Sequence, residues 1–315
     1  FAVYLPRDNA ALRQLDPAST FVPQNFGNGS DDKFAFNSIQ NRNFRYIANT
    51  ILNAGFLQFD NKLSDGLRVV WGLRVENFDQ LVGSVKKWDP RHTYSKVTDY
   101  LPGVNATIKL GQKSNLRATV SQTVIRPELR ELAALSIYDF ELNASVSGNP
   151  SLKRTKITNT DLRYELYPAA GEMFTFGVFY KNFENPIESI YNEGAGGSSL
   201  FSFQNVSQAT AFGFEIEGRK KLNKYFTLQA NGSYINSKID DASLNLSRAL
   251  QGQSPYLINT GLLYDVVEKG FNMTVLFNQV GKRIYLVGDL QAGASTPDVF
   301  ENPRALVDFQ ISKKF

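Results

Sequence analysis

The chain has very few of the residue types on which most catalytic sites depend. Its 315 residues contain no cysteine and a single histidine, His92. Without cysteine the chain can form no disulfide framework and no thiolate metal site. His92 lies in the segment WDPRHTY, and no serine-centred nucleophile motif accompanies it. We therefore predict that the protein is not an enzyme, with no catalytic, cofactor-binding or metal-binding residues and no cofactor.

Long apolar runs are absent as well. No stretch approaches the roughly 18 consecutive apolar residues of a membrane helix. The mean hydropathy of −0.27 would class the protein as soluble. That inference fails for membrane β-barrels, because polar lumen residues dilute the lipid-facing residues one to one. The net charge of +4 is spread out without a basic tract, so we expect no nucleic-acid partner.

What the chain does contain is an alternation of apolar and polar residues with a period of two. The clearest example is the segment 211–236, where Phe212, Phe214 and Ile216 alternate with Glu215 and Glu217. Successive side chains of a strand point to opposite faces, so each arm of this segment has one apolar and one polar face. A short polar connection joins the arms, and the pattern therefore predicts an amphipathic antiparallel hairpin.

The same pattern recurs along the chain and predicts eleven strands. They are 46–60, 67–79, 98–110, 115–124, 158–168, 173–184, the two arms of 211–236, 255–265, 271–281 and 305–315. Short turns alternate strictly with long connections, at about 80–97, 125–157, 185–205, 239–254 and 283–304. Short turns on one rim and long loops on the other are typical of an outer-membrane barrel. We predict an all-β fold, a transmembrane antiparallel β-barrel. The solvated face of a soluble sheet is the alternative for any single strand.

The number of strands indicates part of a larger barrel. Single-chain bacterial barrels have an even number of strands, and eleven strands that start at the outer rim cannot close naturally. We expect residues 46–315 to form a partial outer-membrane barrel. Residues 1–45, rich in Pro, Asn, Gly and Ser, are expected to form an extracellular loop region, with FAVYLP as a candidate strand remnant.

Five segments resemble a known family in that family's order. They are GLRVENF (72–78), the Arg126-Pro127 to GNPSLK stretch (126–153), FYKNFENPIES (179–189), FGFEIEGRKKL (212–222) and LVDFQISKKF (306–315). Together they resemble TonB-dependent outer-membrane receptors, with the closest likeness to receptors of Bacteroidetes-type bacteria. The likeness covers nearly all of residues 46–315.

The resemblance implies a 22-stranded barrel in the bacterial outer membrane, around a plug domain that this chain does not contain. It implies uptake of a large extracellular nutrient (a glycan, a peptide or a metal chelate) with energy from TonB. The implied partners are outer-membrane lipid, the nutrient, the TonB complex through a missing N-terminal segment, and a surface lipoprotein as a candidate. In the family a further hairpin usually follows a segment such as 306–315, so we expect the natural chain to continue. The alternative is a structural or secretion-associated barrel without active transport.

Two groups of polar residues have a predicted place in the barrel. Arg126, Glu128, Arg130 and Glu131 lie at the predicted barrel mouth, where they could bind the nutrient or form internal ion pairs that shape the loop. The second group consists of polar residues from several strands that we predict to face a wide lumen: Arg68, Arg74, Asn105, Arg117, Arg163, Glu165, Glu215, Glu217 and Arg219.

Overall fold

The computed structural model of the chain describes residues 2–4, 6, 8–27, 32–37, 46–140, 143–193, 199–241, 246–288 and 296–314. The chain divides into two compact units, Phe1–Tyr46 and Ile47–Phe315. Among the described residues, no helix is both long and apolar enough to cross a membrane.

The first unit is small and built from short elements. Strand β1 (Ala2–Tyr4) pairs antiparallel with β2 (Ala35–Asn37). Between them lie η1 (Leu12–Gln14), α1 (Pro17–Thr20) and η2 (Pro23–Asn25). The side chain of Asp16 accepts a hydrogen bond from the backbone N–H of Ala18 (2.9 Å) and so caps α1. Buried Leu12 and Phe34 provide its apolar core.

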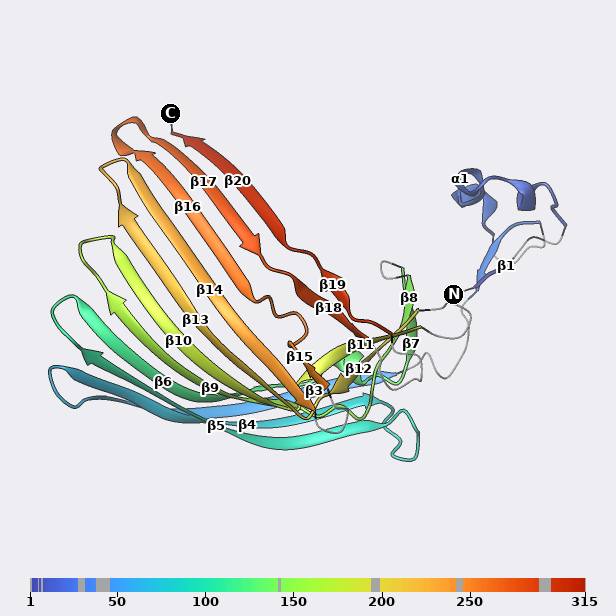
Figure 1. Ribbon diagram of the computed structural model, residues 1–315. Helices are drawn as coiled ribbons and strands as arrows, with labels where there is room; N and C mark the ends of the chain where they lie inside the picture. Colours follow the sequence, from blue (N-terminus) through green and yellow to red (C-terminus); the bar gives the residue numbers. More distant parts are fainter. Residues whose placement is uncertain are drawn as a thin grey trace. The chain divides into compact units, whose positions relative to one another are not determined.

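The second unit is dominated by one antiparallel sheet, here called the wall (Figure 1). Its eleven strands lie side by side in sequence order, which confirms the eleven predicted strands. They are β3 (Ile47–Lys62), β4 (Leu67–Gly83), β5 (Thr93–Lys109), β6 (Ser114–Ile125), β9 (Thr155–Leu166), β10 (Met173–Glu184), β13 (Gln208–Lys221), β14 (Phe226–Asp241), β16 (Tyr256–Val266), β17 (Phe271–Val280) and β20 (Arg304–Lys313). The short strand β15 (Leu246–Arg248) pairs with the end of β14. Within the described residues the barrel is not closed, because β3 pairs only with β4 and β20 only with β17.

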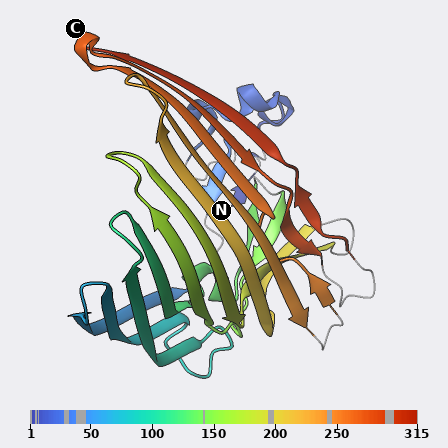
Figure 2. The same ribbon diagram turned by 60° about the vertical axis from the view of Figure 1, so that its left-hand side comes forward.

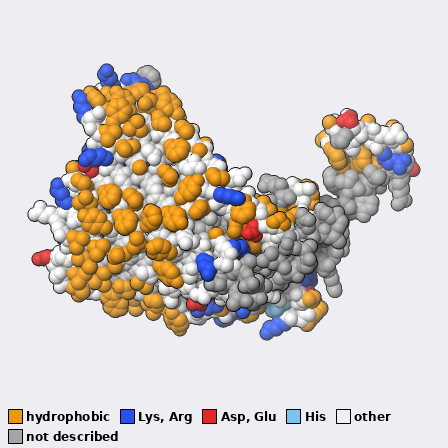
Figure 3. Space-filling view, in the orientation of Figure 1, with side chains coloured by type: hydrophobic (Ala, Val, Ile, Leu, Met, Phe, Trp, Pro, Cys, Tyr) orange, Lys and Arg blue, Asp and Glu red, His pale blue; other side chains and the backbone are white. Residues whose placement is uncertain are grey.

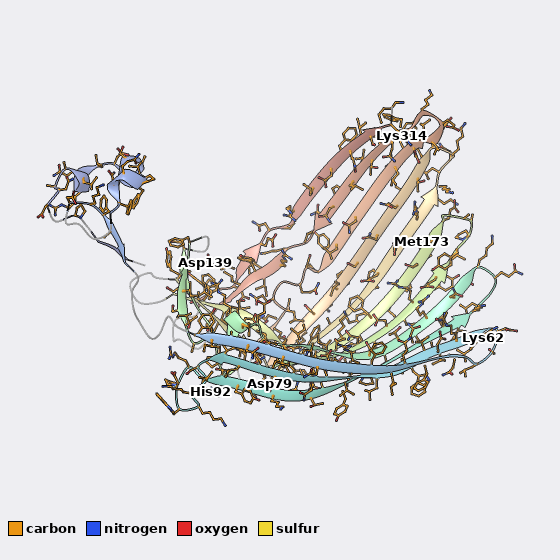
Figure 4. The ribbon with its side chains drawn as sticks, turned by 180° about the vertical axis from the view of Figure 1, so that it is seen from behind. Lys62, Asp79, His92, Asp139, Met173 and Lys314 are labelled. Atoms are coloured by element: carbon orange, nitrogen blue, oxygen red, sulfur yellow. The ribbon has the colours of Figure 1, made fainter. Side chains whose placement is uncertain are left out.

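The wall curves along its length, as the turned view in Figure 2 shows. All short turns lie at one end of the strands and all long connections at the other. Figure 4 marks the short-turn rim with Lys62, Met173 and Lys314, and the opposite end with His92 and Asp139. In the short turn between β16 and β17, η4 (Val267–Lys269) ends at Gly270, whose φ of 55° is the left-handed conformation that glycine adopts without strain.

The register gives the wall two chemically different faces. Phe176, Ile216, Gly232 and Ile258 form one continuous row across four strands on the apolar face. Aromatic pairs support this face between neighbouring strands, for example the rings of Phe214 and Tyr234 at 5.6 Å. Figure 3 shows apolar side chains spread across one face of the molecule, with lysine and arginine mostly at its margins. A band of exposed apolar side chains of this extent is unfavourable in water and requires an apolar medium.

The first long connection is shorter than predicted. We expected it at about 80–97, but β4 continues to Gly83 and β5 begins at Thr93, which leaves only residues 84–92 between them. The strands extend because the long connection after β6 covers their ends. Val82 is buried against Leu132 and Ala133 of that connection. The sequence boundaries were therefore wrong at this rim, where burial against a distant segment decides the strand length.

Three of the long connections are not simple loops, contrary to the prediction. They form a second, six-stranded sheet in the order β19-β18-β11-β12-β8-β7, here called the outer sheet. Its strands are β7 (Ser136–Asp139), β8 (Ala144–Ser147), β11 (Ile187–Glu193), β12 (Ser199–Asn205), β18 (Arg283–Gly288) and β19 (Val299–Glu301). Buried Ala144, Val146 and Phe201 form its core, with Leu286 of β18 packed against them.

Candidate functional site

The most concentrated group of buried charges lies at the outer end of the wall, where β6 ends. Arg126 follows β6 directly, and its guanidinium contacts two carboxylates, with Nη1 2.7 Å from Glu76 and Nη2 2.7 Å from Asp99. Nε of Arg154 lies 2.7 Å from the other oxygen of Asp99, and Nε of Arg74 lies 2.6 Å from Glu76. These five residues form one alternating chain of positive and negative groups, here called the ion network.

The strand register explains why the ion network forms. Glu76 of β4 and Asp99 of β5 are directly opposite each other on the polar face. Like charges in that position repel each other unless a cation lies between them. The side chain of Asp99 is only 2 % exposed and that of Arg126 14 %, so neither has water enough to satisfy it. Arg126 also stacks over the ring of Phe78, with its guanidinium carbon 4.6 Å from the ring centroid.

The other three candidate residues lie in or beside the short helix α2 (Leu129–Leu132). Glu128 is the N-cap of this helix, and its backbone N–H donates to the carboxylate of Glu131 (2.8 Å) in a capping box. Burial raises the pKa of Glu131. Arg130 points to a different partner, Asp139 in β7, at 3.9 Å.

The four candidates are close together in the sequence, but the structure does not bring them into one site. Arg126 belongs to the ion network, Glu128 and Glu131 cap α2, and Arg130 contacts the outer sheet. The sequence did not identify Asp99 as a partner of Arg126, or Arg154 as the second cation at Asp99. The alternation of Arg74 and Glu76 within one strand was the only available signal, since the other partners are 27 and more residues away.

A cavity of about 410 Å³ lies next to the ion network. Its lining includes Phe78, Val97, Arg126 and Arg154, together with residues of the connection after β6. Gln80 closes one side by donating from its side chain to the carbonyl oxygen of Pro127 (3.2 Å).

The nine polar residues predicted to face the lumen share one face of the wall, as the register confirms. Two pairs among them interact across strands: Arg117 with Glu165 at 3.1 Å, and Arg163 with Glu215 at 3.6 Å. Further along the same face, the side-chain amides of Asn231, Asn259 and Asn278 form a hydrogen-bonded ladder across β14, β16 and β17. This face therefore carries charged and amide groups along its whole width.

A second buried ion pair holds the outer sheet. Glu188 of β11, only 1 % exposed, accepts two hydrogen bonds from the guanidinium of Arg248, at 3.0 and 2.5 Å. Gln251 lies in the connection after β15. Its side chain forms hydrogen bonds to the backbone of Ser189 in β11 and to the carbonyl oxygen of Tyr285 in β18. These contacts fix the connection after β15 against two strands of the outer sheet.

The described residues contain no cluster of three or more histidine, aspartate or glutamate side chains that could hold a metal ion. Nδ1 of His92 lies 2.6 Å from the carbonyl oxygen of Ser84 in the connection between β4 and β5. In the same connection, Asp89 is paired with Arg91, and this contact lowers the pKa of the Asp89 carboxyl. His92 and Asp89 thus have structural partners in the loop that contains them.

Comparison with known proteins agrees with the fold described above. The family model described as TonB dependent receptor-like, beta-barrel, matches residues 7–315. No curated protein matches the chain.

Three solved structures share the fold. The copper transporter OprC is 18 % identical with a TM-score of 0.63, over 85 % of this chain and 40 % of that one. The siderophore receptor PirA from Acinetobacter baumannii is 17 % identical with a TM-score of 0.58, over 84 % and 40 %. A mutant of the ferric enterobactin receptor PfeA from Pseudomonas aeruginosa is 16 % identical with a TM-score of 0.57, over 84 % and 37 %. The chain therefore spans about two fifths of the length of these proteins.

Proposed function

The chain belongs to the family of TonB-dependent receptor-like β-barrels, and from that premise we propose that it forms part of the wall of a receptor that imports a large nutrient with energy from TonB. The family is one of outer-membrane transporters and receptors, not of enzymes. The apolar face of the wall contacts membrane lipid, and the polar face lines the interior.

The observation that carries the proposal is the composition of the polar face. The family resemblance implies a barrel of about 22 strands, and the interior of a barrel of that size is too wide for side chains alone to fill. The polar face offers ion pairs such as Arg117–Glu165 and the amide ladder of Asn231, Asn259 and Asn278. Such groups suit contact with a polar plug and a polar cargo. A glycan, a peptide and a metal chelate all meet this chemical requirement.

Several finer features belong to the same proposal. The plug and the TonB-contacting segment would precede residues 46–315 in the complete protein, and residues 1–45 would form an extracellular region. A surface lipoprotein is a candidate partner at the outer sheet. The likeness to Bacteroidetes-type receptors rests on the five sequence segments alone. For the loop residues Arg126, Glu128, Arg130 and Glu131, the contacts favour a structural role over direct cargo binding.

The test is uptake by cells that express the full-length receptor, with radiolabelled ferric siderophore, oligosaccharide and peptide probes. The expected result is that at least one probe enters, that its entry stops when TonB is deleted or the proton gradient is dissipated, and that its surface binding persists. Entry that continues unchanged without TonB would assign the protein to passive porins. No entry of any probe, with an intact barrel, would favour the structural or secretion-associated alternative.

A further inference from the structure

Neighbouring strands β5 and β6 separate before they reach the outer rim. Their pairing runs from Lys109 and Asn115 to Gly103 and Ser121, and stops there. Beyond that point β5 stays paired with β4 up to Thr93, and β6 stays paired with β9 up to Ile125. The wall therefore contains an opening between residues 93–102 of β5 and residues 122–125 of β6, here called the seam.

The sequence explains where the seam begins. Pro102 is the first residue of β5 beyond the paired region, and it has no N–H to donate to a neighbouring strand. Proline in a sheet is compatible with an unpaired edge and not with a central strand. A second proline, Pro127, follows the end of β6 and directs the chain into the connection that covers the seam.

The connection after β6 fills only part of the seam. Arg126 bridges it by contacting Asp99 of β5, and Leu132 packs against Val82 of β4. What is left is the cavity of about 410 Å³, here called the seam cavity. At roughly 30 Å³ for each non-hydrogen atom, it holds a group of about a dozen such atoms.

The seam cavity has a mixed lining of apolar and polar side chains, with an excess of positive charge. Phe78, Val97, Leu132 and Leu152 provide the apolar lining. Of its charged lining residues, four are basic (Arg126, Lys153, Arg154 and Lys156), and one is acidic (Glu184).

These basic side chains differ in how far nearby carboxylates balance their charge. The charge of Arg126 is matched by Glu76 and Asp99 in the ion network. Lys153 and Lys156 are exposed, and Lys156 lies directly opposite Glu184 of β10 in the register. Two lysines against the single carboxylate of Glu184 leave an excess of positive charge at the cavity, and this excess matches a ligand with an anionic end.

The lining residues also come from both faces of the wall. Phe78 and Val97 belong to the polar face, in register with Glu76 and Asp99. Lys156 lies on the opposite, apolar face. It is an even number of residues from Thr160 and Leu162 in β9, and alternate residues of a strand share a face. The cavity is therefore lined by residues from both faces of the wall.

We propose that the seam cavity binds one anionic amphiphile, with its phosphate or carboxylate at Lys153 and Lys156 and its hydrocarbon body between Phe78, Val97, Leu132 and Leu152. The amphiphile comes either from the surrounding membrane or from the medium. This site is independent of TonB-driven uptake, because it lies within the wall itself.

The test is calorimetric titration of the full-length receptor, purified in an uncharged detergent, with dodecyl phosphate and separately with inorganic phosphate. Dodecyl phosphate is expected to bind at one equivalent and inorganic phosphate far more weakly. The double variant Lys153→Gln/Lys156→Gln is expected to weaken dodecyl phosphate binding about tenfold, the combined effect of two partly exposed charge contacts. The matched control Lys109→Gln/Lys221→Gln makes the same charge change at exposed lysines near the short-turn rim, and should leave binding within about twofold.

A second variant tests the apolar part without a charge change. Val97→Phe fills the cavity and is expected to abolish dodecyl phosphate binding, while heat-modifiable migration on gels shows that the barrel is folded. Equal weakening in both lysine double variants, equal affinity for inorganic phosphate, or full binding in folded Val97→Phe would each overturn the proposal. Mass spectrometry of the purified receptor distinguishes the sources. A phosphorylated lipid retained by the wild type and lost from Lys153→Gln/Lys156→Gln identifies the membrane, and binding without a retained lipid identifies the medium.

Discussion

Replacing Arg126 by methionine should destabilise the wall more than any other single charge removal near α2. Methionine keeps the length and the packing of the side chain but leaves Glu76 and Asp99 facing each other without their shared cation. Both carboxylates are nearly buried, so water cannot replace the lost contacts. Breaking a buried ion pair on one side generally costs about 3–5 kcal/mol, because a charge is left uncompensated.

The geometry places the expected cost near the lower end of that range. Arg154 still contacts Asp99, and Arg74 still contacts Glu76, after Arg126 is removed. The loss of the stacking over Phe78 adds roughly 0.5–1 kcal/mol. We therefore expect a total of about 3–4 kcal/mol, which is a change of more than a hundredfold in the unfolding equilibrium.

The assay is urea unfolding of the full-length receptor in lipid vesicles, followed by heat-modifiable gel migration. Arg130→Met is the matched control, because the 3.9 Å contact of Arg130 with Asp139 is exposed, and its loss should cost less than about 1 kcal/mol. In a background of Glu76→Gln and Asp99→Asn, removal of Arg126 should cost much less than in the wild type. Equal costs for the two arginine variants, or no difference between the two backgrounds, would refute the role assigned to the ion network.

Three further outcomes are expected. Ile216→Arg should lower the free energy of unfolding measured in vesicles by about 2–4 kcal/mol. Ile216 lies four strand residues from Lys220, which we place at the membrane interface, so the new charge would lie roughly 10 Å into the lipid. The neighbouring Glu217→Arg, on the polar face, should cost far less, and similar costs would mean that the faces are reversed. Glu188→Ala should speed hydrogen exchange in the outer sheet and leave the wall strands unchanged; uniform protection would show that its buried pair with Arg248 is dispensable. The pKa of Glu131 is raised above its ordinary 4.5, so the folded chain favours the protonated carboxyl. The resulting contribution to stability is complete below pH 4.5 and is lost as the pH rises through the raised pKa. Protection of α2 should therefore fall as the pH rises above 4.5 in the wild type and stay constant in Glu131→Gln, and a parallel fall in both would contradict the assignment.

The strands of the wall could be predicted because their signal is local. Phe212, Phe214 and Ile216 alternate with polar residues within a single strand, and that alternation fixes both the strand and its faces. The outer sheet could not be predicted in this way. Ile190 of β11 pairs in parallel with Val287 of β18, nearly a hundred residues away, and these strands are too short to carry a periodic pattern.

The candidate site was only partly predictable for a related reason. The sequence placed Arg126 at the outer rim and left open whether it binds cargo or forms internal pairs. Its partners depend on which residues of β4 and β5 lie opposite each other, and the short connection at 84–92 sets that register. Because the length of this connection was overestimated, the pairing of Glu76 with Asp99 was not predicted. The need for a cation between these two carboxylates was therefore not predicted either.

The most direct test of the whole account is an accessibility scan along β13. The 315 residues contain no cysteine, so single cysteines can be introduced from Ala211 to Arg219 and spin-labelled without first removing a native cysteine from these residues. In the full-length receptor in vesicles, collisions with oxygen report lipid and collisions with a nickel chelate report water. We predict a period of two, with oxygen preferred at 212, 214 and 216 and nickel preferred at 213, 215 and 217. Labels that all favour the nickel chelate, or that show no alternation, would contradict the conclusion that this sheet is the wall of an outer-membrane barrel.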